Sequence, residues 1–195
     1  MDLQAAKQFI LAQLHAGLPD FRTYHSLEHT LDVHAAAVRL AAGEGIAGED
    51  LALLETAALF HDSGFLVRPN DHESGSCLIA REALPRFGYS DAQVDRVCGL
   101  IMSTVVPQAA DDALSNVLCD ADLDYLGRDD FFLIGDRLFR ELMAMGAIAD
   151  RKEWDRLQVS FLSRHVYYTA ASRTLREPRK QEHLAEVRRR LAGQS

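Results

Sequence analysis

The stretch Thr56-Ala-Ala-Leu-Phe-His61-Asp62-Ser-Gly-Phe65 decides the fold of this chain. It is an apolar run that ends in two adjacent side chains able to bind a metal ion, because imidazole offers a neutral nitrogen and a carboxylate offers an anionic oxygen. Burying an aspartate is costly unless something pairs with it. We therefore expect a cation at the end of a buried helix, held by further ligands from elsewhere in the chain.

The apolar run from Leu51 to His61 has no polar face, which predicts a helix at the centre of its domain. The rest of the chain shows helical spacing of apolar residues, interrupted by glycine and proline. Capping-box patterns at Ser90–Gln93 and Asp150–Glu153 mark two helix starts. The expected helices cover residues 2–14, 26–42, 51–61, 72–87, 90–103 and 114–125, then segments that begin at Asp129 or Asp130, at Asp150 and at Pro178.

No alternating strand pattern occurs, so the predicted fold class is all-α, a single compact helical bundle formed by residues 1–195. The net charge of −8 argues against a general nucleic-acid binder. The sequence shows neither an apolar run long enough to span a bilayer nor a signal peptide, and its three cysteines lack CxxC spacing. These features predict a cytoplasmic protein with reduced thiols, without a membrane or nucleic-acid polymer as partner.

Two further groups of polar residues interrupt apolar helices. His25 and His29 lie in Tyr24-His-Ser-Leu-Glu-His-Thr30, and Asp120 and Asp122 lie in Cys119-Asp-Ala-Asp-Leu-Asp-Tyr-Leu-Gly127. Residues 120 and 122 are about 200° apart on a helix, so only one of them points inward. Three helices could thus bring two imidazoles and two carboxylates to one divalent ion, which would lower the pKa of a water molecule. The competing interpretation is a structural hydrogen-bond cluster.

This order of a histidine, a His-Asp pair and a later aspartate resembles the HD superfamily of metal-dependent phosphohydrolases. The resemblance covers a motif core of about residues 24–127, and helices within 129–193 would complete the domain. In families of this type the later aspartate commonly follows an alanine, which favours Asp122 over Asp120. The resemblance therefore implies as metal ligands His29, His61, Asp62 and Asp122.

The Tyr-His-x-x-x-His form also resembles the cyclic-nucleotide phosphodiesterase signature, in which the first histidine is a general acid, although Ser26 replaces the usual asparagine. By that match His25 is a proton donor; otherwise it caps the next helix. His72 stands where many HD proteins carry a histidine for a second metal or a phosphate; otherwise it simply starts a helix. Residues 100–104 contain hydroxyls and no histidine, which argues against a complete second site. We expect one divalent ion per chain, of Mn, Fe, Ni, Co, Zn or Mg.

The function that the resemblance implies is hydrolysis of a nucleotide or small phosphate ester, either a phosphomonoester or a cyclic phosphodiester, through a metal-activated water. The candidate catalytic residues are His25, Asp62 and His72. The candidate ligands of an anionic substrate are Arg68, His165, Arg173 and Lys180, for which solvated or structural roles are the alternatives. His15 and His183 are expected at the surface.

Two other activities remain open. An HD fold can keep its metal without turnover and serve as a regulatory or sensory module, and HD oxygenases use a di-iron pair, for which a second set of ligands is missing. The helices that carry Phe131-Phe132 and Trp154 could form the face of a homodimer, but core packing explains these aromatic residues equally well.

Overall fold

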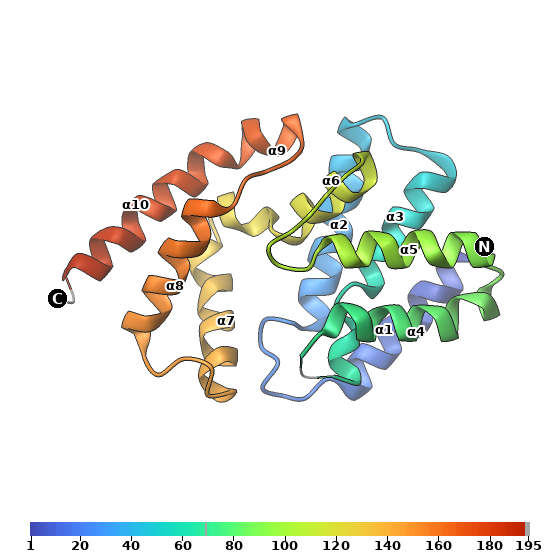
Figure 1. Cartoon of the computed structure of the whole chain (residues 1–195), viewed down its shortest axis with the longest axis horizontal. Helices are drawn as coiled ribbons and strands as arrows, with labels where there is room; N and C mark the ends of the chain where they lie inside the picture. The colour runs from blue at the N-terminus through green and yellow to red at the C-terminus, as the bar shows by residue number, and fades with distance from the viewer. Residues whose placement is uncertain (69, 194–195) are drawn as a thin grey trace. The chain divides into compact units, whose positions relative to one another are not determined.

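The computed structural model of the chain describes residues 1–68 and 70–193 (Figure 1). These residues form ten α-helices and three short 3-10 helices, and they include no β-strand. The prediction of an all-α fold is therefore confirmed. Within the described residues, no helix has both the length and the hydropathy needed to cross a membrane.

Contacts divide the chain into two compact units, and that both belong to a single domain stays a prediction. The first unit comprises Met1–Pro19 and His25–Asp122, and it contains all four predicted metal ligands. Its elements are α1 (Leu3–Gly17), α2 (Leu27–Gly43), α3 (Gly48–Phe60), η1 (Ser63–Leu66), α4 (His72–Ala83), η2 (Leu84–Phe87), α5 (Asp91–Ser103) and α6 (Ala113–Asp122).

Helix α3 is the centre of the first unit, as its apolar sequence predicts. It packs against α1, α2, α4, α5 and α6. Every residue from Thr56 to Phe60 is buried, and Ala57, Ala58, Leu59 and Phe60 have no exposed surface at all. Full burial of this run removes apolar surface from water on every side of the helix. The end of α3, where His61 and Asp62 follow, is thereby fixed in the middle of the unit.

Two helices end earlier than their sequences predict. The segment from His72 is α-helical only to Ala83 and continues as the 3-10 helix η2, which contains Pro85. Proline has no N–H to donate to the carbonyl four residues earlier, so the α-helix cannot continue through it. Likewise α6 stops at Asp122, and Asp124–Gly127 form the 3-10 helix η3.

The two predicted capping boxes have different outcomes. Ser90 accepts the amide of Gln93, and the Gln93 side chain accepts the amide of Ser90, so this box is complete. Asp150 accepts the amide of Glu153 at 2.8 Å, but Glu153 reaches back to the amide of Ala149 at 2.7 Å. Each arrangement gives two backbone amides at the start of the helix a side-chain acceptor.

The second unit comprises Asp20–Tyr24 and Leu123–Ser195. Within it, α10 runs alongside α8, as the red and orange helices of Figure 1 show. Its core is an aromatic and aliphatic cluster that includes Tyr24, Tyr125, Phe131 and Tyr167. Its elements are η3 (Asp124–Gly127), α7 (Phe131–Ala144), α8 (Arg151–Arg164), α9 (Ala170–Leu175) and α10 (Glu177–Gly193).

The second unit departs from the sequence prediction at two places. The short helix α9 was not expected; the Thr169 side chain caps it by accepting the amide of Ser172. The expectation that His183 lies at the surface is wrong, because its ring is buried and stacks on Phe131 with centroids 4.5 Å apart. Its Nδ1 also lies 2.9 Å from the carbonyl oxygen of Leu126, so a polar side chain is satisfied in the interior.

Candidate metal centre

A tight turn after α3 fixes His61 and Asp62. His61 continues the helical backbone with φ −54° and ψ −40°, whereas Asp62 leaves it with φ −101° and ψ 3°. Ser76 of α4 donates its hydroxyl to the carbonyl oxygen of His61 at 2.6 Å and accepts the amide of Gly64 at 2.8 Å. One side chain from a neighbouring helix thus holds both ends of the turn.

Glycine allows this turn to touch α4. A Cβ atom on Gly64 would lie 1.7 Å from the carbonyl oxygen of His72, and one on Gly75 would lie 3.0 Å from the Cα of Gly64. A larger residue at position 64 would push the two backbones apart. Their close approach places Nε2 of His72 3.1 Å from Oδ1 of Asp62.

His29 reaches the same point from the first turn of α2. Ser26 caps this helix, with its side-chain oxygen 3.4 Å from the amide nitrogen of His29. Because α2 packs against both α3 and α6, the His29 ring is carried to the end of α3. Its Nε2 atom lies 3.4 Å from Nε2 of His61, and both rings are buried.

Two carboxylates complete the cluster around these imidazole nitrogens. Oδ1 of Asp122 lies 3.3 Å from Nε2 of His29 and 3.5 Å from Nε2 of His61. Oδ2 of Asp62 lies 3.3 Å and 3.2 Å from the same two nitrogens. Ligand atoms bound at about 2.1 Å to one ion are separated by about 3.0–3.4 Å. The ligand atoms of His29, His61 and Asp122 all lie within 4.8 Å of one another, so this group could hold a metal ion.

The donor atoms of the cluster suit a cation. Nδ1 of His61 lies 2.8 Å from the carbonyl oxygen of Ala58, a contact that places a proton on Nδ1 and directs Nε2 at the other ligands. Among the described residues, none donates a well-directed hydrogen bond to the buried Oδ2 of Asp62, although both imidazoles are close to it. A buried carboxylate oxygen in this state needs a positive partner, and a divalent ion supplies one.

The electrostatics of the cluster lead to the same conclusion. Burial lowers the pKa of His29, but the adjacent carboxylates of Asp122 and Asp62 outweigh it and raise this pKa to about 9. The pKa of His61 is also raised, because the two aspartates outweigh its burial. Burial acts to raise the pKa values of Asp62 and Asp122, yet the imidazoles lower both overall. The carboxylates therefore attract positive charge, which protons on the imidazoles or a divalent ion can provide.

The two aspartates that the sequence left as alternatives have different positions in the structure. Asp122 is the last residue of α6 and lies in the cluster, whereas Asp120 is fully buried two residues earlier. The second oxygen of Asp122, Oδ2, lies 3.2 Å from Nε2 of Gln108, which also donates to the carbonyl oxygen of Cys119 at 3.3 Å. Neither Gln108 nor Ser76 was predicted, since a single polar residue in a loop or a helix carries no periodic signal.

The two histidines predicted to be catalytic lie beside the cluster and share one aromatic contact. His72 stacks on Phe65 with ring centroids 4.0 Å apart, and His25 packs on the same phenylalanine at 4.5 Å. The ring of His25 is 6.2 Å from that of His29. Nε2 of His72 is also 3.4 Å from Oε1 of Glu73. Ring contacts thus link four histidines of the first unit in the order His72, His25, His29 and His61.

The segment where a second set of ligands would be expected is occupied by local hydrogen bonds. Ser103 donates its hydroxyl to the carbonyl oxygen of Leu100 at 2.7 Å, and Thr104 donates to Ile101 at 2.8 Å. The thiol of Cys119 is directed at the carbonyl oxygen of Ser103 at 3.2 Å. The hydroxyls of Ser103 and Thr104 therefore donate hydrogen bonds to carbonyl oxygens in the last turn of α5.

The candidate ligands of an anionic substrate fall in both units. Arg68 is exposed in the first unit and pairs with Asp71 at 3.2 Å. In the second unit Nζ of Lys180 is buried, donates to the carbonyl oxygen of His165 at 2.7 Å and lies 2.8 Å from Oε2 of Glu177. Arg173 donates to the carbonyl oxygen of Tyr167 at 3.5 Å. The local partners of Lys180 account for its burial, and substrate binding by these residues stays a prediction.

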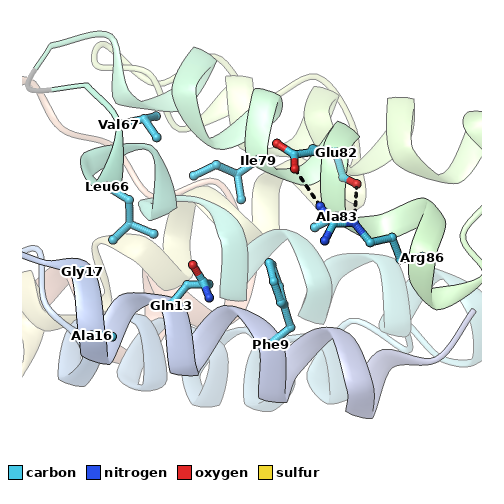
Figure 2. A pocket seen from close by; sticks show the side chains of 10 residues that line it. All are labelled: Phe9, Gln13, Ala16, Gly17, Leu66, Val67, Ile79, Glu82, Ala83 and Arg86. Atoms are coloured by element: carbon cyan, nitrogen blue, oxygen red, sulfur yellow. Dashed lines mark hydrogen bonds and ion pairs between the residues drawn. The ribbon is translucent and has the colours of Figure 1, made fainter.

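A separate cavity of about 400 Å³ lies in the first unit between α1, η1 and α4 (Figure 2). Phe9 and Gln13 of α1 face Leu66 and Ile79 across it, and Arg86 at one end is paired with Glu82 at 2.7 Å. Of the described residues that line it, none is a predicted site residue. Its walls contain no group of metal ligands like that around His61, so the reaction is not placed here.

The comparisons with known proteins agree with this geometry. The family model for the HD domain matches residues 26–123, which is half of the chain. A crystal structure of a predicted HD superfamily hydrolase from an uncultured Thermotogales bacterium is similar to this chain, with a TM-score of 0.60 and 23% sequence identity. The match covers 96% of this chain and 92% of that one, and at this identity it shows a shared fold. No curated protein matches the chain significantly.

Proposed function

This chain belongs to the HD domain family, and on that premise we propose that it is a metal-dependent phosphohydrolase acting on a nucleotide or small phosphate ester. The observation that carries the proposal is the convergence of two imidazoles and two carboxylates on one point. Family membership and this cluster support a metal-dependent hydrolase. The phosphate ester is the finer part of the proposal, and it rests on the nature of the ligands and on the histidines beside them.

The residues that would hold the ion are His29, His61, Asp62 and Asp122. A divalent ion bound there supplies Lewis acidity and lowers the pKa of a water molecule toward neutrality. Two imidazoles and two carboxylates accept several first-row ions, so manganese, iron, cobalt, nickel, zinc and magnesium are all candidates. Asp62 has a second task, because its Oδ1 accepts a hydrogen bond from Nε2 of His72 at 3.1 Å.

His72 and His25 are the proposed proton donors to the leaving oxygen. Asp62 and the stacked ring of Phe65 hold His72 in one orientation, and the ring of His25 contacts both Phe65 and His72. An orientation fixed by hydrogen bonding and stacking is what a general acid needs before a substrate arrives. Hydrolysis of a phosphomonoester and of a cyclic phosphodiester both require such a donor. The proposed substrate class therefore includes both.

An anionic substrate must be attracted against a net charge of −8. The ion and the imidazoles would supply most of that attraction. Arg68 could add a bidentate contact to phosphate, because a guanidinium group matches two phosphate oxygens. Its exposed ion pair with Asp71 stabilises the chain by at most about 1 kcal/mol. Exchange of that partner for a phosphate group would therefore cost little.

The proposal is tested with the purified full-length chain after removal of metal by a chelator. Phosphomonoesters, cyclic nucleotides and nucleoside triphosphates are screened with added manganese, nickel, cobalt or magnesium. We expect ion-dependent phosphate release or ring opening that falls by at least about 100-fold in Asp62→Ala. The matched control is His15→Ala. It removes an exposed histidine of α1 that is not part of the cluster, so this variant should keep full activity.

Turnover that survives both the chelator and Asp62→Ala would contradict the proposal. An ion bound at full occupancy with no turnover of any of these substrates would favour the regulatory module. A dinuclear iron spectrum would favour the oxygenase.

A further inference from the structure

Cys77 of α4 and Cys98 of α5 face each other across two packed helices of the first unit, which run side by side in Figure 1. The thiol of Cys77 is directed at the carbonyl oxygen of Cys98 at 3.6 Å, and the thiol of Cys98 is directed at the carbonyl oxygen of Cys77 at 3.7 Å. Each side chain therefore reaches the backbone of the other residue. Such reciprocal contacts bring the two β-carbons toward the separation of about 3.8 Å that a disulfide needs.

The third cysteine is in a different environment. Cys119 has no exposed surface, and burial raises the pKa of its thiol to about 12. Its sulfur is directed at the carbonyl oxygen of Ser103 at 3.2 Å. A thiol that is buried and kept protonated is inert, so Cys119 is not part of the proposed pair.

The two facing thiols are inequivalent in charge and in access to solvent. The neighbouring Cys77 thiol lowers the pKa of Cys98 against the effect of its burial, and Arg81 contributes in the same direction. The neighbouring Cys98 thiol and burial raise the pKa of Cys77. Cys77 is only half-buried, whereas Cys98 is 4% exposed. The pair thus contains one thiol whose thiolate form is stabilised, Cys98, and one thiol that solvent can reach, Cys77.

We propose that Cys77 and Cys98 are a redox-active pair that closes to a disulfide when a small hydroperoxide reaches it. The thiolate of one cysteine attacks one peroxide oxygen, the O–O bond breaks, and hydroxide leaves with a proton as water to give a sulfenic acid. The sulfur of the other cysteine then attacks the sulfenyl sulfur, the S–O bond breaks, and the second oxygen leaves as water. Two thiols supply two electrons, one hydrogen peroxide is reduced to two waters, and one S–S bond forms.

The position of the pair gives this chemistry a structural consequence. Cys77 follows Ser76, whose hydroxyl holds the turn from His61 to Gly64, and α4 begins at His72. A disulfide between Cys77 and Cys98 would therefore join α4 to α5, and α4 is the helix whose Ser76 holds the turn after α3. The disulfide itself does not depend on the proposed hydrolase activity, so either can fail without the other.

The test uses the full-length Cys119→Ser chain, because trypsin cuts nowhere between Val97 and Arg128 and would leave Cys98 and Cys119 in one peptide. The reduced protein is treated with one equivalent of hydrogen peroxide and its intact mass is measured. We expect the loss of two hydrogen atoms, reversal by dithiothreitol, and a tryptic crosslink between the peptides that contain Cys77 and Cys98. The midpoint of thermal unfolding before treatment confirms that each variant is folded.

Cys77→Ser and Cys98→Ser, each combined with Cys119→Ser, separate the pair from general oxidation. Both should lose the crosslink completely, and the remaining thiol should gain oxygen atoms or stay unchanged. The proposal is overturned if the Cys119→Ser chain gives only oxygen adducts, only disulfides between chains, or no reaction at all. It is also overturned if the loss of two hydrogen atoms persists in either double variant.

Discussion

Nε2 of His29 and Nε2 of His61 face each other at 3.4 Å, although the two residues are 32 positions apart and lie on different helices. Two imidazole nitrogens can share one proton or one cation at this distance, but they cannot both donate into the space between them. The oxygens of Asp62 and Asp122 close the same space. The arrangement is therefore built around a positive charge.

The pH dependence of ion binding follows from the raised pKa values of the two imidazoles. His29 has a pKa of about 9 in the folded chain against 6.5 for the free side chain, and the pKa of His61 is raised as well. A metal ion needs their unprotonated nitrogens, so binding at pH 7 should release protons, and the affinity should rise as the pH approaches 9. Calorimetric titrations with manganese in two buffers of different ionisation enthalpy measure the proton release.

In the chain without an ion, the free energy of unfolding should fall with rising pH, whereas ion affinity should rise. Because the folded state holds the His29 proton more tightly than the unfolded state, this proton contributes stability that is fully present below pH 6.5 and is lost as the pH rises through about 9. Urea unfolding of the chelated protein should show a falling free energy of unfolding over that range. A free energy of unfolding that rises with pH, or binding without proton release, would show that the imidazoles are already neutral.

Exchange of the two aspartates of α6 for asparagine tests which of them binds the ion. Asp122→Asn removes the charge beside His29 and His61, so we expect ion affinity to fall by at least about 100-fold. Asp120→Asn makes the same chemical change two residues earlier and should retain the ion. Measured ion content and thermal unfolding of both variants decide the matter. Loss of the ion in Asp120→Asn, with retention in Asp122→Asn, would reverse the assignment.

Gln108 should act through Asp122. Its amide nitrogen lies 3.2 Å from Oδ2 of Asp122, which leaves Oδ1 directed at the imidazoles. Gln108→Leu removes this donor, and partners of this kind contribute about 10–100-fold to metal affinity. Gln4→Leu, the same change at an exposed position of α1, is the control. Equal ion affinity in both variants, measured by competition with a chelating dye, would remove Gln108 from the site.

Gly64 should tolerate no side chain. A Cβ atom there would lie 1.7 Å from the backbone oxygen of His72, so Gly64→Ala should cost about 3 kcal/mol or more of unfolding free energy. In a chain of this size that corresponds to roughly 6–12 °C in the unfolding midpoint. The matched control is Gly99→Ala, where a Cβ atom meets nothing within 4 Å and alanine favours the helix. Equal midpoints for the two variants would show that η1 and α4 are not in such close contact.

The sequence predicted most of the helices because their signals are local, and the prediction of a metal site rests on local signals as well. The apolar run of α3, the Ser90–Gln93 cap and the His-Asp pair can each be seen within a few residues. The pairing of Gln108 with Asp122 and of Lys180 with His165 cannot, since each depends on how separate segments pack. For the same reason, helical geometry alone left Asp120 and Asp122 open, and the surface expectation for His183 was wrong. Pro85 was visible, but its effect on the helix from His72 was underestimated.

Titration of the chelated protein with manganese, followed by calorimetry, tests the central claim most directly. The account predicts one ion per chain, a rise of roughly 5–10 °C in the unfolding midpoint at about 100 times the dissociation constant, and loss of both effects in His61→Ala. An absence of binding, or binding that His61→Ala leaves unchanged, would show that His29, His61, Asp62 and Asp122 do not form a metal centre.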